Sequence, residues 1–337
     1  MIKKEKPKIL SLFSGAGGLD LGFRNADFDI CYSVENDKCT FQTYRYNFPK
    51  TKHLEDSIIN IKKEHITQKI DGIIGGPPCQ SWSEAGAQRG INDPRGKLFY
   101  EYVRIIDLFK PKFFLAENVQ GLLFTKHSKS FNNIIKKFSN LNYKVDFQLL
   151  DAVNFDVPQN RKRVFIIGIR KDLKKDFKFP IGNILKKNLT LKETIWDLRD
   201  AIPSKNKNIS NGQFLKNNNI QNNEFMTGTF SSLYMSRNRV RSWDEPSYTI
   251  QAGGRHAPIH PGAPKMIKIG KDKMKFDKKN KDKYRRLSVR ECARIQTFPD
   301  DFIFFYEKLS DGYKMVGNAV PVKLAEIIAR EIKKTLF

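Results

Sequence analysis

Short apolar runs alternate with amphipathic stretches through the first 170 residues of the chain. The apolar positions have helical spacing in three stretches: one that begins at Leu19, one over 98–109 and one over 131–138. Because strands and helices alternate, the pattern predicts an α/β fold with a doubly wound, mostly parallel sheet covered on both faces. The apolar runs that predict its β-strands lie at 8–13, 29–34, 70–74, 113–116, 144–150 and 163–169.

The regular pattern weakens after about residue 171. Residues 171–284 are rich in lysine, asparagine and short loops, which predicts a second, smaller domain of irregular structure. Helical amphipathicity returns at 320–334, where Pro321 is acceptable in the first turn of a helix. We therefore predict a large domain over 1–180, a small domain over 181–300, and a terminal segment over 301–337 that returns to the large domain.

Composition narrows the class of protein. The 337 residues include 61 Lys and Arg against 36 Asp and Glu, a net charge of +25. This excess indicates a polyanionic partner such as nucleic acid, although a lysine-rich solvated surface would give the same count. The 26 Phe and 11 Tyr can build a core, which excludes general disorder. No apolar run can span a membrane and no signal peptide is recognisable, so we expect a soluble, cytoplasmic protein.

The sequence indicates neither a disulfide scaffold nor a metal site. The four cysteines are few and scattered, at Cys31, Cys39, Cys79 and Cys292. The chain has no Cys-x-x-Cys pair, and its five histidines do not stand at the spacing of zinc ligands. We therefore expect no metal.

A glycine-rich turn, FSGAGG from Phe13 to Gly18, follows the first predicted strand and precedes a helix. Glycines in such a turn let backbone N–H groups approach a ligand. Glu35 ends the next strand, where a carboxylate can accept both hydroxyls of a ribose. The glycines do not match the G-x-G-x-x-G pattern that a nicotinamide oxidoreductase would require. They are more typical of a nucleoside cofactor without a pyrophosphate, such as S-adenosylmethionine.

Three further segments carry candidate reactive groups. Cys79 follows two prolines that fix a loop at a strand end, where a thiol can act as a nucleophile rather than as a small buried apolar residue. Glu117 comes directly after four apolar residues, as a helix cap or as a buried acid with a raised pKa. Arg161 and Arg163 share one face if their segment is extended, and each taken singly would be a surface charge.

Together these residues resemble the cytosine-5 DNA methyltransferase family. The matching segments follow the family's order from Phe13 to Ala325: FSGAGGLDLGF, GGPPCQSWS, ENV, QNRKR, RRLSVRECARIQTFPDDF and GNAVPVKLA. The stretch MSRNRVRSWDEPSYTIQAGGR, with CQSWSE and DPRGKLFYEY upstream, is similar to the GGCC-specific (HaeIII-type) modification methylases. The resemblance implies a Rossmann-like methyltransferase domain joined to a smaller, irregular target-recognition domain.

The resemblance also implies methyl transfer from S-adenosylmethionine to carbon 5 of a flipped-out cytosine, with S-adenosylhomocysteine as product. Cys79 would add to carbon 6 of the base. Glu117 would hold or protonate N3, and Arg163, with Arg161, would bind O2 and stabilise the charge that the addition creates. No residue is assigned as the base that removes the carbon-5 proton.

By the same resemblance, residues from both ends of the chain would line the cofactor pocket. Asp56 would take the adenine amino group, within Glu55-Asp56-Ser57 where the family usually has Gly-Asp-Ile, so the neighbouring apolar contact stays open. The other expected cofactor residues are Phe13, Gly15, Ala16, Gly17, Gly18, Leu19, Glu35, Asn36, Pro77, Leu98 and Asn318.

Contacts to DNA are expected from two segments. The polar, glycine-containing stretch 81–95, which begins with Ser81 and Trp82, resembles the mobile loop that closes over a flipped base. In the small domain, Arg239, Arg241 and Arg255 are candidates for reading guanine, because an arginine fork matches O6 and N7 in the major groove. A phosphate contact is the alternative role of each arginine.

Other functions remain to be weighed against this one. A tRNA cytosine-5 methyltransferase shares the motif order but has a shorter insert after QNRKR than the roughly 115 residues here. A catalytically dead homologue would have no reason to keep Cys79, Glu117 and Arg163. We expect the modification enzyme of a type II restriction-modification system, a monomer acting on double-stranded DNA, with a cognate restriction endonuclease for the same site.

Overall fold

The computed structural model describes residues 5–78, 94–183, 189–210, 220–230 and 232–337. Within it the chain divides into two compact units. Unit 1 comprises residues 1–151, 162–182 and 324–337, and unit 2 comprises residues 152–161 and 183–323. The chain thus leaves unit 1 twice and returns to it twice. The domain limits expected from the sequence stay a prediction.

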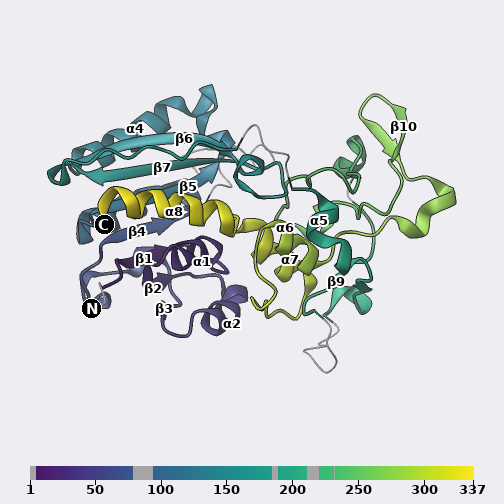
Figure 1. The fold of residues 1–337 in the computed structure, drawn as a ribbon, viewed down its shortest axis with the longest axis horizontal. Coiled ribbons are helices and arrows are strands. Elements are labelled where there is room, and N and C mark those ends of the chain that lie inside the picture. Colours follow the sequence, from purple (N-terminus) through teal and green to yellow (C-terminus); the bar gives the residue numbers. More distant parts are fainter. Residues whose placement is uncertain (1–4, 79–93, 184–188, 211–219, 231) are drawn as a thin grey trace. The chain divides into compact units, whose positions relative to one another are not determined.

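Unit 1 contains a seven-stranded sheet in the order β3-β2-β1-β4-β5-β7-β6 (Figure 1). The first five strands in this order pair in parallel, whereas β7 runs antiparallel to both β5 and β6. The predicted doubly wound, mostly parallel α/β fold is therefore confirmed. The sequence pattern does not predict β3, because this edge strand is short and partly polar. The strands are β1 (Lys8–Leu12), β2 (Asp29–Val34), β3 (Lys52–Leu54), β4 (Gly72–Gly75), β5 (Phe113–Val119), β6 (Tyr143–Asp151) and β7 (Lys162–Arg170).

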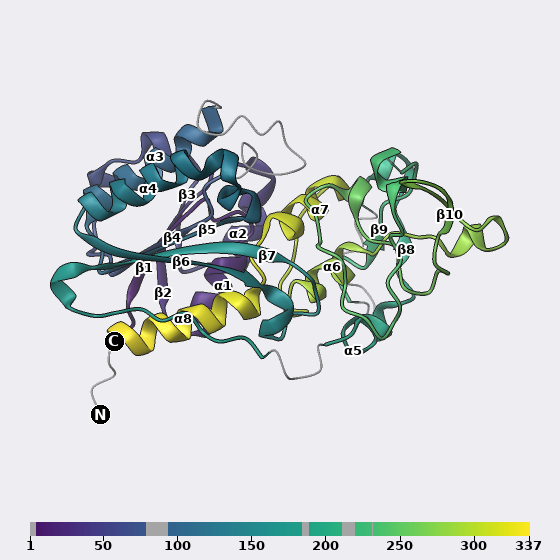
Figure 2. The same cartoon turned by 90° about the horizontal axis from the view of Figure 1, so that it is seen from above.

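Helices cover both faces of this sheet, with α3 and α4 on one face and α1 and α8 on the other (Figure 2). Phe113 and Phe114 of β5 point to opposite faces because side chains alternate along a strand. The Phe113 ring packs on Phe23 and Phe337, whereas the Phe114 ring packs on Phe138. In the described part of the chain, none of the helices is long and apolar enough to cross a membrane. The helices of this sheet are α1 (Gly18–Asn25), α2 (Lys38–Asn47), α3 (Pro94–Phe109), α4 (Ser128–Asn140) and α8 (Val322–Leu336).

The parallel strands end in one row. Leu12 at the end of β1 pairs with Val34 of β2 on one side and with Gly75 of β4 on the other. Val34 in turn pairs with Leu54, and Gly75 pairs with Ala116 of β5. The residues that follow these positions therefore emerge side by side at the carboxyl edge of the sheet, where open α/β sheets bind their ligands.

A buried polar network supports the glycine-rich turn at this edge. The carboxylate of Asp20, on the first turn of α1, is fully buried and accepts hydrogen bonds from Ser11 Oγ at 2.6 Å and from Tyr44 Oη at 2.5 Å. The Tyr44 ring stacks on Phe48. A Cβ on Gly17, whose φ is +93°, would lie 2.3 Å from the Phe48 ring. The glycine-rich turn is therefore held in place by contacts with β1 and α2. A side chain at position 17 would displace the turn.

Unit 2 has little regular structure, in agreement with the weak periodicity of its sequence. Its elements are short because most backbone groups bond across loops rather than within long ladders. They are α5 (Leu191–Ile195), β8 (Ile202–Pro203), β9 (Glu224–Phe225), β10 (Ile267–Gly270), β11 (Lys273–Lys275), α6 (Val289–Ile295) and α7 (Leu309–Asn318), with several 3₁₀ turns between them.

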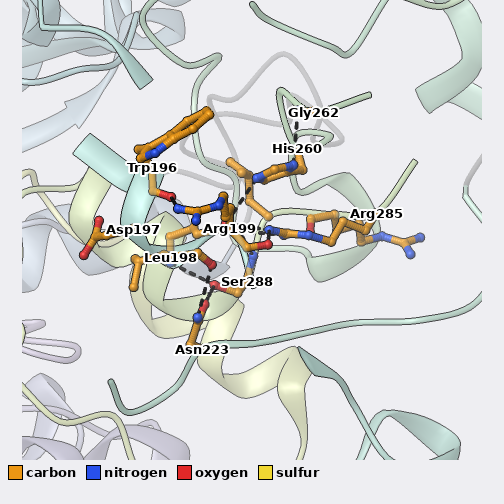
Figure 3. Close-up of polar contacts among 12 residues, drawn as sticks. Trp196, Asp197, Leu198, Arg199, Asn223, His260, Gly262, Arg285 and Ser288 are labelled. Carbon is orange, nitrogen blue, oxygen red and sulfur yellow. Dashed lines mark hydrogen bonds and ion pairs between the residues drawn. The ribbon is translucent and has the colours of Figure 1, made fainter. Parts of the chain in front are cut away.

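The first turn of α6 organises the interior of unit 2. Glu291 is fully buried and accepts two hydrogen bonds from the Arg285 guanidinium, at 2.7 and 2.8 Å, and one from the Ser288 amide at 2.7 Å. Figure 3 shows Arg285 also reaching the Arg199 carbonyl, and Ser288 beside Asn223. One buried charge pair thus holds together segments that lie far apart in the sequence.

Asp20→Asn is expected to change how the stability of the protein depends on pH. Burial raises the pKa of Asp20 to about 6 from an ordinary 3.8, so the native state binds this proton more tightly than the unfolded chain. The stability contributed by the protonated carboxyl is complete below about pH 4 and is lost as the pH rises through about 6. Relative to the wild type, the variant should gain about 3 kcal/mol between about pH 4 and pH 7.

Urea unfolding followed by circular dichroism across this pH range measures the difference, with the exposed Asp107→Asn as a control for the lost charge. A difference between variant and wild type that stays constant with pH would contradict the raised pKa.

Candidate active site

The acidic end of β5 lies beside the start of β7. The sequence predicts a strand over 113–116, but β5 continues to Val119, three residues beyond the last position that pairs with β4. The extension is paired on one side, where Val119 stands opposite Arg163 of the antiparallel β7. Glu117 is therefore a strand residue rather than a helix cap, and it faces the first residues of β7.

Glu117 and Arg163 form a buried ion pair. Arg163 Nε lies 2.9 Å from Glu117 Oε1, and the two side chains are only 15% and 11% exposed. A Cβ added to Gly76 would stand 3.3 Å from Glu117 Oε2, so the glycine lets the loop after β4 pass close to the carboxylate. The pair offers a fixed carboxylate and a fixed cation at the carboxyl edge of the sheet.

Asn118 connects the loop that contains Pro77 to the strand that carries Glu117. Its Nδ2 donates to the Pro77 carbonyl at 3.1 Å, and its Oδ1 accepts from the Val119 amide at 2.9 Å. Sequence reasoning did not give Asn118 a role, although a buried polar residue inside an apolar strand is a signal that could have drawn attention to it. The predicted nucleophile Cys79 and the predicted DNA contacts Ser81 and Trp82 lie outside the described residues.

Arg161 and Arg163 have different hydrogen-bond partners, and the expected joint role of the two arginines stays a prediction. The strand begins only at Lys162, and Arg161 belongs to unit 2 with a side chain that is 1% exposed. Its guanidinium donates to the carbonyls of Ile250, Gly317 and Ala319 at 2.8 to 3.0 Å. Two of these bonds hold the backbone on either side of Asn318. Contacts of this kind are typical of an arginine that stabilises the fold.

Two glutamines extend this network in unit 2. Gln159 Nε2 donates to Gln296 Oε1 at 2.8 Å, and Gln159 Oε1 accepts from the Ile250 amide at 2.8 Å. Gln296 Nε2 donates to the carbonyls of Val316 and Ala319. The sequence analysis recognised both glutamines only as parts of matching segments. Their joint role depends on contacts between residues more than 130 positions apart, which no local pattern reveals.

Glu35 and the glycine-rich turn form a cradle in unit 1. The Glu35 carboxylate accepts from the amides of Gly15, Asn36 and Asp37 at 2.8, 2.8 and 2.9 Å. Burial nevertheless raises the pKa of Glu35 above its ordinary value, because desolvation outweighs these bonds. One carboxylate oxygen receives a single amide, which leaves it a lone pair for a ligand hydroxyl.

The glycine-rich turn has open space at Gly15 and a buried hydroxyl at Ser14. Gly15 has a φ of +53°, and no heavy atom lies within 4 Å of the position that its Cβ would take. Ser14 Oγ is buried and has no hydrogen-bond partner within the described ranges. Asp56 is exposed, and its Oδ1 accepts from both Ser57 N and Asn60 Nδ2.

The remaining expected cofactor residues differ in exposure. Phe13, at φ +54°, and Leu98 are half-buried and pack against the main core of unit 1. Asn318 is exposed at the end of α7 in unit 2, so its place beside the other cofactor residues stays a prediction. Asn36 is exposed, whereas the buried members of the set are Ala16, Gly17, Gly18, Leu19 and Pro77.

The three arginines expected to read DNA have different surroundings in unit 2. Arg239 Nε donates to the Tyr234 carbonyl at 2.8 Å. Arg241 pairs with Glu245 Oε1 at 2.8 Å and donates to Asn160 Oδ1 at 3.2 Å. Arg255 is exposed on a 3₁₀ turn and has no polar partner among the described residues. Within this set, Arg255 presents its whole guanidinium to a ligand.

Arg237 shares this property although sequence reasoning did not single it out. It is exposed and also has no hydrogen-bond or ion-pair partner in the part of the chain that the structure describes. Its position two residues before Arg239, in the run SRNRVR, is the signal that could have identified it.

The sheet order, the glycine-rich cradle and the carboxylate–guanidinium pair define a methyltransferase of the Rossmann-like class. The family model described as C-5 cytosine-specific DNA methylase matches residues 7–334. The chain therefore belongs to the C-5 cytosine-specific DNA methylases, and it is a DNA (cytosine-5)-methyltransferase.

Known proteins resemble the chain over nearly its whole length. Type II methyltransferase M.FnuDI of Fusobacterium nucleatum is 54% identical over 331 residues, which cover 98% of this chain and 95% of that protein. Type II methyltransferase M.NgoPII of Neisseria gonorrhoeae is 52% identical, with 98% and 96% covered. A crystal structure of a DNA modification methyltransferase encoded within a prophage (E. coli) superposes with a TM-score of 0.75 at 26% identity, covering 98% of this chain and 99% of that one.

Substitution by lysine should lower the stability of the protein more at Arg161 than at Arg163. Arg161→Lys keeps the charge but cannot reach three carbonyls, so buried acceptors lose their donors and stability should fall by about 2 kcal/mol or more. Arg163→Lys keeps a cation beside the buried Glu117 carboxylate, so only one hydrogen bond is weakened and stability should change by about 1 kcal/mol. Urea unfolding measures both values. Equal destabilisation by the two substitutions would contradict the distinction.

Proposed function

We propose that this enzyme methylates carbon 5 of a cytosine in duplex DNA within the sequence GGCC, using S-adenosylmethionine. The observation that carries the reaction is the buried pair of Glu117 and Arg163 beside the Pro77 loop. A pyrimidine ring that accepts a nucleophile at carbon 6 gains negative charge on N3 and O2. A carboxyl group and a guanidinium held side by side match these two atoms.

Cys79, two residues after Pro77, is the proposed nucleophile. Its thiolate forms a bond to carbon 6 and moves the electron pair of the 5,6 double bond toward carbon 5 and the N3–O2 side of the ring. Glu117 hydrogen-bonds or protonates N3, and Arg163 stabilises O2. Carbon 5 then becomes nucleophilic enough to be methylated. Loss of the carbon-5 proton, to water or another base, and expulsion of Cys79 restore the aromatic ring.

The proposed cofactor site is the cradle of unit 1. S-adenosylmethionine supplies an electrophilic methyl group when it is bound. Glu35 would accept the ribose hydroxyls, and Asp56 would accept the adenine amino group. The backbone of the glycine-rich turn and the Ser14 hydroxyl would bind the polar end of the amino acid part.

Sequence reading is assigned to unit 2. The target base must leave the stack, which costs a few kcal/mol that phosphate contacts offset. Arg255 is the proposed guanine contact, because it is exposed and has no polar partner among the described residues. Arg239, whose Nε donates to the Tyr234 carbonyl, stays a candidate for the same role. Arg241 is held by Glu245 and Asn160, so a phosphate contact or a positioning role is the alternative for it.

The biological setting that we propose is a type II restriction-modification system. Relatives at 52 to 54% identity are named Type II methyltransferases. A cognate endonuclease would cut the same site without needing to bind the methylase. One flipped base requires one active site, so we propose a monomer, with residues 181–300 as the target-recognition domain.

The reaction is tested by bisulfite sequencing of an unmethylated plasmid after incubation with the protein and S-adenosylmethionine. We expect protection from conversion at one cytosine of GGCC, and none with Cys79→Ser, because serine cannot supply a thiolate. Omission of the cofactor should also remove protection.

Protection at a different sequence would support the proposed reaction but contradict GGCC as the recognition sequence. No protection with the wild-type protein would contradict DNA as the substrate, and transfer RNA would be tested next.

Arg255→Ala should lower kcat/KM on a GGCC duplex by about 5- to 150-fold, equivalent to roughly 1–3 kcal/mol for one arginine–guanine contact. The loss should shrink on duplexes with another base at the contacted position. Arg241→Ala serves as a comparison, because loss of a positioning contact would lower activity on all duplexes alike. An Arg255→Ala enzyme with unchanged activity and specificity would exclude this arginine as a guanine contact.

A further inference from the structure

Residues 265–283 of unit 2 form a basic projection that is termed the lysine arm. It consists of the antiparallel hairpin of β10 and β11 followed by the 3₁₀ turn Lys278–Lys283. The hairpin is visible as a separate ribbon at β10 in Figure 1. The arm contains nine lysines and three aspartates, hence a net charge of 9 − 3 = +6 within 19 residues.

These positive charges are not neutralised. Among the described residues, none of the nine ammonium groups has an ion-pair partner, and all nine lysines are exposed. The Asp277 carboxylate accepts from the Lys279 amide at 3.0 Å and from the Asn280 side chain, through Nδ2, at 2.8 Å. Like charges crowded on a short hairpin repel one another, so this arrangement favours a polyanion that spans several lysines.

The base of the arm is joined to the segment that carries the DNA-reading arginines. The Met266 amide donates to Asn238 Oδ1 at 3.0 Å, between Arg237 and Arg239. Met266 and Tyr284 belong to the same small core as Tyr234 and Val240, and Phe276 packs against it. This core fixes the arm relative to the arginine segment within unit 2.

The exposed strand face has the composition of a backbone-binding surface rather than of a base-reading one. Ile267 and Ile269 are 42% and 56% exposed and share one face of the hairpin, where Lys275 stands opposite Ile267. The face has no arginine, asparagine or glutamine that could form a two-point contact with a base edge. Ammonium groups suit phosphates, and short aliphatic side chains suit the deoxyribose between them.

We propose that the lysine arm binds the phosphates of duplex DNA that flanks the recognition site, independently of sequence. The inference rests on the proposed function of unit 2 in reading DNA. A strand of four residues extends about 13 Å, so the arm covers roughly four base pairs beyond the arginine contacts. It adds affinity and salt dependence without adding specificity.

The test compares a variant with four lysines of the lysine arm substituted with a matched control variant. The arm variant carries Lys268→Gln, Lys271→Gln, Lys273→Gln and Lys275→Gln. The control removes the same charge from exposed lysines of unit 1, with Lys63→Gln, Lys69→Gln, Lys175→Gln and Lys178→Gln. Dissociation constants are measured against salt on a long GGCC duplex, on one cut about two base pairs outside the site, and on a long duplex without GGCC.

We expect the arm variant to bind the long duplexes at least about 10-fold more weakly at low salt, with the slope of log K against log salt reduced by about 2 to 4. On the short duplex it should match the wild type. The ratio of affinities for GGCC and non-cognate DNA should stay unchanged.

An unchanged salt slope, an equal loss in the control variant, or an equal loss on the short duplex would each overturn the proposal. A change in the GGCC preference would also overturn it, because the arm would then read bases. Failure of the proposed GGCC specificity is recognised separately, by the absence of any wild-type preference for GGCC, while the long non-cognate duplex still measures the arm.

Discussion

The direction of β7 is the constraint on which the site depends. In a parallel strand, the first residues lie at the amino edge of the sheet, far from the ligand. Because β7 runs antiparallel to β5, its first residues reach the carboxyl edge, and Arg163 stands opposite Val119 and pairs with Glu117. The parallel strands β1, β2 and β4 end in the same row. One reversed strand thus adds a cation to an edge otherwise formed by turns and carboxylates.

Buried polar groups fix the backbone in both units. In unit 1, Asp20 fixes the start of α1 under the glycine-rich turn, and Asn118 fixes the loop that precedes the predicted nucleophile. In unit 2, Arg161 and Gln296 donate to the carbonyls that precede and follow Asn318. Each group would be costly to bury alone, and each is buried with partners. A strand and a helix supply those of Asp20, whereas loop carbonyls are among those of Asn118 and Arg161. The loops therefore keep their shape without long secondary structure.

The sequence predicts unit 1 better than unit 2 for a physical reason. Strands buried on both faces read as continuous apolar runs, so β2 agrees with its predicted range, whereas the short edge strand β3 leaves no such signal. The Glu35 cradle follows from its motif, and the Glu117–Arg163 pair depends on a strand direction that periodicity does not encode. Arg161 and Arg163 look alike in sequence, and only tertiary contacts separate the structural cation from the one beside Glu117.

The chain itself couples the two units at this point. Arg161 belongs to unit 2 and Arg163 to unit 1, with a single residue between them. Two peptide units span at most about 7 Å, so the Cα atoms of the two arginines stay within that distance whatever the arrangement of the units. The proposed reading of DNA in unit 2 and the proposed chemistry in unit 1 are therefore linked covalently next to the Glu117–Arg163 pair.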